Sequence, residues 1–209
     1  MLPGFRYLPG YLDGARQQDV LAALRAVVAE APFYRPSMPR SGRPFSVEMT
    51  NAGPLGWYSD KSGYRYRPAH PATGRPWPKI PDVLQALWQE LAACGAPPEC
   101  CLINRYKGEK ARMGLHQDRD ERIFEAAVVS LSLGDSAVFR LGGRARRDPT
   151  RSFKLHSGDL VILSGEARLA FHGIDRVLGG SSKLLRGGGR LNVTLRRVNP
   201  LLAEATTEP

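Results

Sequence analysis

The chain has 209 residues, 42% hydrophobic and 24% charged, which is enough for one domain with its own core. Its net charge of +10 favours encounters with polyanions such as nucleic acid. Three cysteines without a CxxC pair argue against a disulfide framework and a structural zinc site. Free thiols suit a reducing compartment, so we expect a cytoplasmic protein. The first 18 residues hold no apolar run typical of a signal peptide or membrane span, so we expect no membrane partner.

Two helices are predicted in the first half of the chain. Asp13 or Gly14 is expected to cap a helix that runs to about Glu30, because its apolar residues recur at helical spacing. The segment 32–81 is rich in Pro, Gly and Arg, which favours short strands and loops. Asp82 is then expected to cap a second helix, which Gly95 closes.

The second half of the chain changes to short apolar runs separated by glycines. This pattern is typical of an all-β sandwich or barrel, so the overall class is expected to be α+β, with the two helices packed on a β body. The predicted strands are Cys101–Tyr106, Ala126–Leu133, Ala137–Leu141, Asp159–Leu163, Arg168–His172 and Arg190–Arg196.

A His-x-Asp pair, His116 and Asp118, offers an imidazole nitrogen and a carboxylate to one point if the chain is extended there, because alternate residues of a strand share a face. His172 ends a predicted strand and can supply a third ligand. Two His and one carboxylate form the facial triad of non-haem Fe(II) oxygenases. The other histidines, His70 and His156, lie in turn-rich segments without such a carboxylate and are expected to be structural.

The run RLNVTLR, residues 190–196, alternates between polar and apolar residues. Arg190, Asn192, Thr194 and Arg196 share one face of a strand, and leucines and a valine share the other. If the apolar face packs outward, two arginines point into the barrel, where they need an anionic partner. A dicarboxylate gripped by an arginine fork is such a partner.

These segments together resemble the AlkB family of 2-oxoglutarate-dependent nucleic-acid demethylases over residues 45–197. The resemblance rests on CLINRYKGEKARMGLHQDRDE, VVSLSLG, SGDLVILSGEARLAFHGI and RLNVTLR. It implies a double-stranded β-helix (jelly-roll) core at 99–198, with 1–98 as an N-terminal extension of helices and lid, in one catalytic domain over 1–209. It also implies Fe(II) on His116, Asp118 and His172, with O2 as co-substrate. The implied contacts of 2-oxoglutarate are Asn104, Tyr106, Arg190, Asn192 and Arg196.

The segment LGWYSDKSGYRY resembles the nucleotide-recognition lid of that family. The implied substrate-binding residues are Trp57, Tyr64, Tyr66, Asp120 and Arg146, although Arg144 or Arg147 could replace Arg146 if the alignment is offset. The implied reaction demethylates N1-methyladenine or N3-methylcytosine in single- or double-stranded DNA, and also in RNA. Its products are formaldehyde, succinate and CO2, and we expect the protein to act as a monomer.

Two alternatives remain open on the sequence. The same oxidation could act on RNA, a protein side chain or a small molecule. A non-enzymatic nucleic-acid-binding module could instead use the barrel only as a scaffold, but it would have no need of two His and one Asp beside an inward-facing arginine strand.

Overall fold

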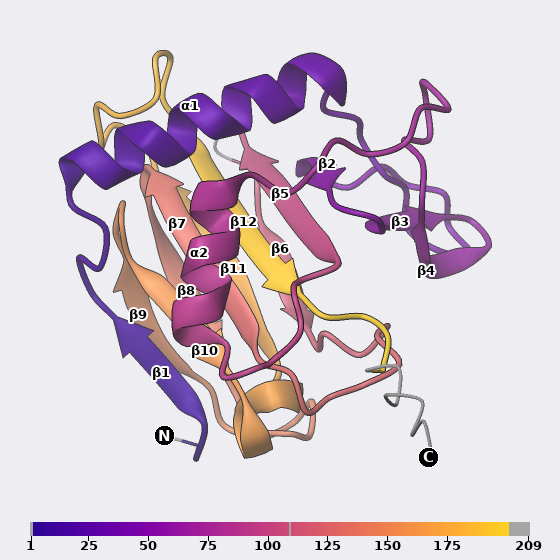
Figure 1. Ribbon diagram of the computed structural model, residues 1–209. Coiled ribbons are helices and arrows are strands. Elements are labelled where there is room, and N and C mark those ends of the chain that lie inside the picture. The colour runs from indigo at the N-terminus through magenta and orange to yellow at the C-terminus, as the bar shows by residue number, and fades with distance from the viewer. Residues whose placement is uncertain (1, 109, 201–209) are drawn as a thin grey trace, which may run out of the picture.

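The computed structural model describes residues 2–108 and 110–200. Two antiparallel sheets and a separate hairpin make up its β structure (Figure 1). The larger sheet has the order β1 (Phe5–Leu8), β10 (Leu160–Leu163), β7 (Val128–Gly134), β12 (Arg190–Arg196), β5 (Cys100–Tyr106) and β2 (Glu48–Ala52). The smaller sheet has the order β6 (Met113–His116), β11 (His172–Leu178), β8 (Ser136–Leu141) and β9 (Arg151–Leu155). The chain therefore has the expected α+β class with a jelly-roll core.

The two helices cover the outer face of the larger sheet (Figure 1). Helix α1 (Gly14–Glu30) begins as expected, because the side chain of Asp13 accepts a hydrogen bond from the Arg16 amide. Helix α2 (Asp82–Leu91) buries Leu84 and Trp88 in the same apolar core as Val193 and Leu195 of β12. The outward-facing residues of β12 are thus buried under helices, which directs its polar residues to the jelly-roll interior.

Several predicted boundaries were wrong. Asp82 is the first residue of α2 rather than its cap, and the helix ends at Leu91, four residues before Gly95. The early end follows from tertiary contacts, because the indole of Trp88 donates to the carbonyl of Ala96 and so holds the chain in a turn. None of the helices within residues 2–108 and 110–200 is long and apolar enough to cross a membrane.

The predicted strand Arg168–His172 was also wrong. Residues Gly165–Leu169 form a short 3-10 helix, and His172 begins strand β11 rather than ending a strand. The side chain of Arg168 turns into the interior and donates to the carbonyls of Ala126 and Asp118. The edge strand β9 was missed, since its sequence RSFKL is largely polar and exposed.

The hairpin of β3 (Gly56–Asp60) and β4 (Gly63–Arg67) lies next to β2, at the far edge of the larger sheet from β1 (Figure 1). Its strands face each other in register from Gly56 with Arg67 to Asp60 with Gly63. The bonds between Trp57 and the side chain of Asn51 in β2 attach this hairpin to the larger sheet. We call residues 56–67 the lid hairpin.

Candidate active site

Strands β6 and β11 bring the three candidate metal ligands together. His116 and His172 are partners in the sheet register, and their ring centroids are 4.5 Å apart. One ligand atom from each of His116, Asp118 and His172 lies within 4.8 Å of the others. Gly173 permits this approach, because a Cβ there would lie 2.6 Å from the carbonyl oxygen of Met113 on the neighbouring strand.

The geometry of the His-x-Asp pair differs from the one expected. His116 is the last residue of β6, and Asp118 lies beyond the strand, so the two do not share a strand face. The turn nevertheless places His116 Nε2 3.7 Å from Asp118 Oδ1.

Both imidazoles present the same nitrogen to the centre of the cluster. Nδ1–H of His116 donates to the carbonyl of Gly114 at 2.8 Å, and Nδ1–H of His172 donates to that of Ala170 at 3.0 Å. A carbonyl only accepts, so Nδ1 of each ring carries the proton and Nε2 keeps its lone pair. Burial lowers the pKa of His172 to about 4, so its ring is neutral at physiological pH.

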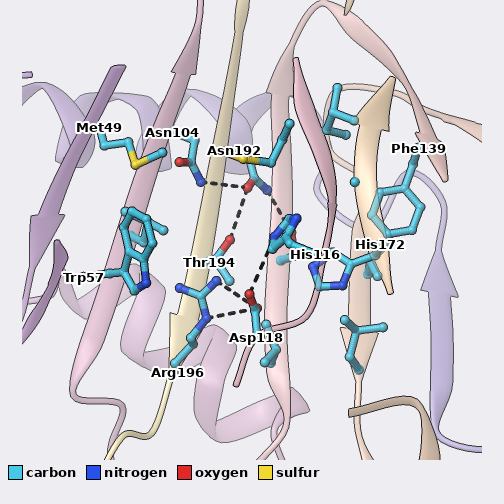
Figure 2. Close-up of a pocket in the computed structure, with 18 of the residues that line it drawn as sticks. Met49, Trp57, Asn104, His116, Asp118, Phe139, His172, Asn192, Thr194 and Arg196 are labelled. Atoms are coloured by element: carbon cyan, nitrogen blue, oxygen red, sulfur yellow. Dashed lines mark hydrogen bonds and ion pairs between the residues drawn. The ribbon is translucent and has the colours of Figure 1, made fainter. Parts of the chain in front are cut away.

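Asp118 is held ionised by a buried arginine. Arg196 donates to its Oδ2 through Nη2 at 2.8 Å and through Nε at 3.1 Å (Figure 2). Burial would raise the pKa of Asp118, but Arg196 and the two histidines together hold the pKa below its usual range. The result is a carboxylate with Oδ2 occupied by Arg196 and Oδ1 facing the histidines.

Replacing Asp118 by Ala should destabilise the metal-free protein by about 3 kcal/mol, because it leaves the buried guanidinium of Arg196 without its closest anion. Urea unfolding of metal-free protein measures this loss. Asp175→Ala is the matched control, since Asp175 pairs with Arg176 at the surface, and its effect should stay below about 1 kcal/mol. Equal stabilities for the two variants would show that the buried pair contributes no more to stability than a surface ion pair.

The polar face of β12 lines the cavity, as its alternation predicts. Asn192 lies at the centre of this face: it accepts from Asn104 and Thr194 and donates to Ser130 (Figure 2). Asn104 lies opposite Asn192 in the register of β5 and β12, and Tyr106 lies opposite Arg190. The residues predicted to contact 2-oxoglutarate therefore line the same cavity as the His–Asp–His cluster. The volume of this cavity is about 140 Å³.

Arg190 is buried and only partly paired. It is 1% exposed, its Nη2 donates to Ser132 at 2.9 Å, and its guanidinium lies 5.1 Å from the centroid of the Tyr106 ring. Its Nε and Nη1, and also Oδ1 of Asn104, have no hydrogen-bond partner among the described residues. Burial lowers the pKa of Arg190, opposed by Tyr106, so an anion at these free donors would stabilise the charged side chain.

A glycine-rich loop delivers Arg190 to this position. Gly187, Gly188 and Gly189 all have positive φ, which only glycine adopts without strain. The amide of Gly189 donates to Asp135, and a Cβ on Gly189 would lie 2.7 Å from the carbonyl of Tyr106. The run GGGR thus turns tightly against β5 immediately before β12 begins.

The lid hairpin also contributes to the lining of the cavity. Trp57 and Tyr64 line it and are stacked on each other, with centroids 5.4 Å apart and an interplanar angle of 25°. The indole of Trp57 donates to Asp120 Oδ2 at 2.8 Å. Burial raises the pKa of Asp120, an effect that the indole opposes. An aromatic pair and a carboxylate therefore face the same space as the candidate metal ligands.

Comparison with known proteins agrees with this geometry. The family profile of the 2OG-Fe(II) oxygenase superfamily matches residues 4–196. The alpha-ketoglutarate-dependent dioxygenase AlkB homolog of Caulobacter vibrioides is 54% identical over 199 residues, covering 94% of this chain and 89% of the relative. The chain belongs to the AlkB family. Escherichia coli AlkB is 40% identical over 184 residues, covering 86% of this chain and 84% of the relative. The solved structure of OsALKBH1 superimposes with a TM-score of 0.75 at 30% identity, covering 94% of this chain and 99% of that one.

As a member of the AlkB family, the chain is a dioxygenase that uses Fe(II), 2-oxoglutarate and O2. The non-enzymatic binding module considered above is therefore wrong. Family membership by itself does not assign roles to residues. Two of the predicted substrate contacts of this AlkB protein lie outside the cavity.

Tyr66 and Arg146 do not line the cavity. The hydroxyl of Tyr66 donates to Glu121. Arg146 lies in an exposed loop, donates to the carbonyl of Leu115 at 3.0 Å, and has its guanidinium 5.7 Å from the ring centroid of Phe171. Tyr64 and Tyr66 lie two residues apart in β4 and share a strand face, so the alternation predicts the same side for both. Only the tertiary contact with Glu121 shows that Tyr66 does not line the cavity.

Two residues of the site were missed in the sequence. Glu121 and Arg168 are buried and form an ion pair at 3.2 Å next to Asp118. Glu121 follows the run HQDRD directly, so a third acidic residue in a nearly uninterrupted polar segment was the available signal. Arg168 gave no signal, because its segment resembled an ordinary strand.

Proposed function

We propose that this dioxygenase oxidatively demethylates N1-methyladenine and N3-methylcytosine in DNA, with RNA as a further polymer substrate. The products are formaldehyde, succinate and CO2. The observation that carries this proposal is that one cavity joins the His–Asp–His cluster to the stacked Trp57 and Tyr64 and to Asp120. We retain the monomeric state and cytoplasmic location expected from the sequence.

The donor set fits Fe(II). Two imidazoles with free Nε2 atoms and one ionised carboxylate are the ligands of the facial triad, and we assign them to His116, His172 and Asp118. Bound Fe(II), together with O2 and 2-oxoglutarate, supplies the oxidation of a methyl C–H to a hydroxymethyl group, while 2-oxoglutarate becomes succinate and CO2. The hydroxymethyl group on nitrogen then leaves as formaldehyde.

We assign the far carboxylate of 2-oxoglutarate to Arg190. Its Nε and Nη1 atoms have no partner among the described residues, and the side chain is buried, so a carboxylate there would accept from both atoms and balance the charge. On the neighbouring strand β5, Tyr106 is the register partner of Arg190, and Asn104 lies two residues before Tyr106. Asn192 lies two residues after Arg190 on β12. Arg196 was the other candidate, but its Nε and Nη2 are already bound to Asp118, so we assign it to holding Asp118 and the adjacent end of the co-substrate.

The lid side of the cavity fits a flipped, positively charged base. Trp57 and Tyr64 offer stacking surfaces, and base-aromatic stacking contributes about 1–3 kcal/mol per base. Methylation at N1 of adenine or N3 of cytosine leaves a positive charge on the ring, which the nearby carboxylate of Asp120 stabilises. The net charge of +10 supports a polyanionic substrate. Since Tyr66 and Arg146 do not line the cavity, we assign neither to the base, and we assign the exposed Arg146 to a phosphate of the polymer.

The protein should release formaldehyde from short oligonucleotides that carry N1-methyladenine or N3-methylcytosine, and much less from an oligonucleotide with a neutral O-methylated base. The reason is that only the cationic bases gain from Asp120. Formaldehyde release is measured on single-stranded DNA, double-stranded DNA and RNA carrying each lesion. If only proteins or free small molecules are oxidised, and no oligonucleotide binds at low salt, the nucleic-acid substrate is wrong while the oxygenase class survives.

A further inference from the structure

The candidate ligand Asp118 belongs to a buried cluster of four charged side chains, together with Glu121, Arg168 and Arg196. Glu121 lies between two guanidinium groups: its Oε2 is 3.2 Å from Arg168 Nη2, and its Oε1 is 3.4 Å from Arg196 Nε. The side chains of Glu121 and Arg168 are 1% and 2% exposed. The cluster holds two acidic and two basic groups, so it is neutral as a whole and each charge depends on its neighbours.

Both arginines of the cluster donate hydrogen bonds to Asp118. Arg196 donates to its carboxylate oxygen Oδ2, and Arg168 Nη1 donates to its backbone carbonyl at 2.7 Å. The side chain and the main chain of Asp118 are thus each fixed by a guanidinium that Glu121 also contacts. A displacement of Glu121 would therefore move both arginines, and with them the side chain and the main chain of Asp118.

The lid hairpin reaches the same cluster. The hydroxyl of Tyr66 in β4 donates to Glu121 Oε1, the oxygen that faces Arg196. Trp57 in β3 donates to Asp120, one residue before Glu121. Two hydrogen bonds from the lid hairpin are therefore accepted by consecutive residues, Asp120 and Glu121, which follow Asp118 closely. Tyr66 and Glu121 are 55 residues apart in the sequence.

We propose that Glu121 is a positioning residue that couples the lid hairpin to Asp118 through Tyr66 on one side and Arg196 and Arg168 on the other. The inference rests on the proposed role of Asp118 as a metal ligand. When the lid carries Tyr66 inward, the hydrogen bond holds Glu121, and Glu121 holds the arginines that orient the carboxylate. Coupling of this kind is reciprocal, so binding of a metal at Asp118 restrains the lid to the same extent.

A merely structural cluster makes a different prediction. In that case the buried ion pairs stabilise the fold, but the mobility of the lid does not depend on what binds at Asp118. Amide hydrogen exchange in residues 56–67, with and without Co(II) and 2-oxoglutarate, separates the two because it reports local opening of the hairpin. Co(II) serves as a redox-stable probe, and neither oligonucleotide nor turnover is involved.

Binding of Co(II) and 2-oxoglutarate should slow exchange in the lid hairpin of the original protein by about fivefold or more, the lower end of typical couplings between sites. Tyr66→Phe removes only the hydroxyl and should abolish most of this slowing. Tyr58→Phe is the matched control on the same hairpin, because the Tyr58 hydroxyl makes no hydrogen bond within the described residues, and it should retain the full effect. Glu121→Gln should behave like Tyr66→Phe if it folds.

Equal slowing in the original protein and in Tyr66→Phe would overturn the proposal, as would an absence of slowing in the original protein when Co(II) is bound. Co(II) affinity is measured in the same samples and should fall in Tyr66→Phe but not in Tyr58→Phe. If the original protein fails to bind Co(II), the metal site itself is wrong, and that failure is distinct from a site that binds metal without restraining the lid.

Discussion

Replacing His116 by Ala should lower the rate of 2-oxoglutarate decarboxylation by more than about 100-fold, because loss of a group that only orients a ligand already costs about 10- to 100-fold. The same loss is expected for His172→Ala and Asp118→Ala. Succinate release measures the rate. His116 is the most informative of the three positions, since Asp118 is buried and His172 is half-buried beside Phe139, so removing either also disturbs the interior.

The fold should survive His116→Ala. The side chain is 40% exposed, and its one hydrogen bond goes to the nearby carbonyl of Gly114. Circular dichroism and thermal unfolding of the metal-free protein should therefore match those of the original. His156→Ala is the control: this exposed histidine binds Ser136 outside the cavity, and its loss should leave decarboxylation intact. Near-normal succinate release by His116→Ala would remove His116 from the ligand set.

Replacing Arg190 by Ala should raise the KM for 2-oxoglutarate by about 10- to 100-fold, which corresponds to the loss of a charge-assisted, two-pronged contact. The KM for a methylated oligonucleotide should change much less, since Arg190 belongs to β12, beside Tyr106, and not to the lid hairpin. Steady-state kinetics with each substrate varied in turn measures both constants. Arg190→Lys should give an intermediate KM, because it keeps the charge and loses the fork.

Arg105→Ala is the control for Arg190→Ala. Arg105 lies on the neighbouring strand β5 but faces away from the cavity, where it pairs with Glu48 at 2.7 Å. Its loss should leave the KM for 2-oxoglutarate unchanged. Arg196→Ala should instead lower stability and metal affinity together, because Arg196 holds Asp118. An unchanged KM in Arg190→Ala would contradict the assignment of the far carboxylate to this residue.

Local patterns in the sequence determined the parts of the molecule that depend on near neighbours. The spacing of apolar residues and the side chain of Asp13 predicted α1 with its correct start, because a helix and its cap form within a few residues. The alternation of RLNVTLR predicted which residues of β12 line the cavity, because the period of a strand is a property of its backbone. The resemblance to the AlkB family supplied the jelly roll, which neither pattern specifies.

Tertiary structure decided everything that depends on a distant partner. The different roles proposed for Arg190 and Arg196 follow from a bond between Arg196 and a carboxylate 78 residues away, and nothing in the local pattern distinguishes the two arginines. The displacement of Tyr66 from the cavity and the burial of Arg168 likewise follow from contacts with Glu121, 55 and 47 residues away in sequence. Buried charges must find a partner wherever the fold provides one. The sequence alone therefore indicated which side chains of β12 face inward, and only the folded chain decided which of them are paired and which remain free for a ligand.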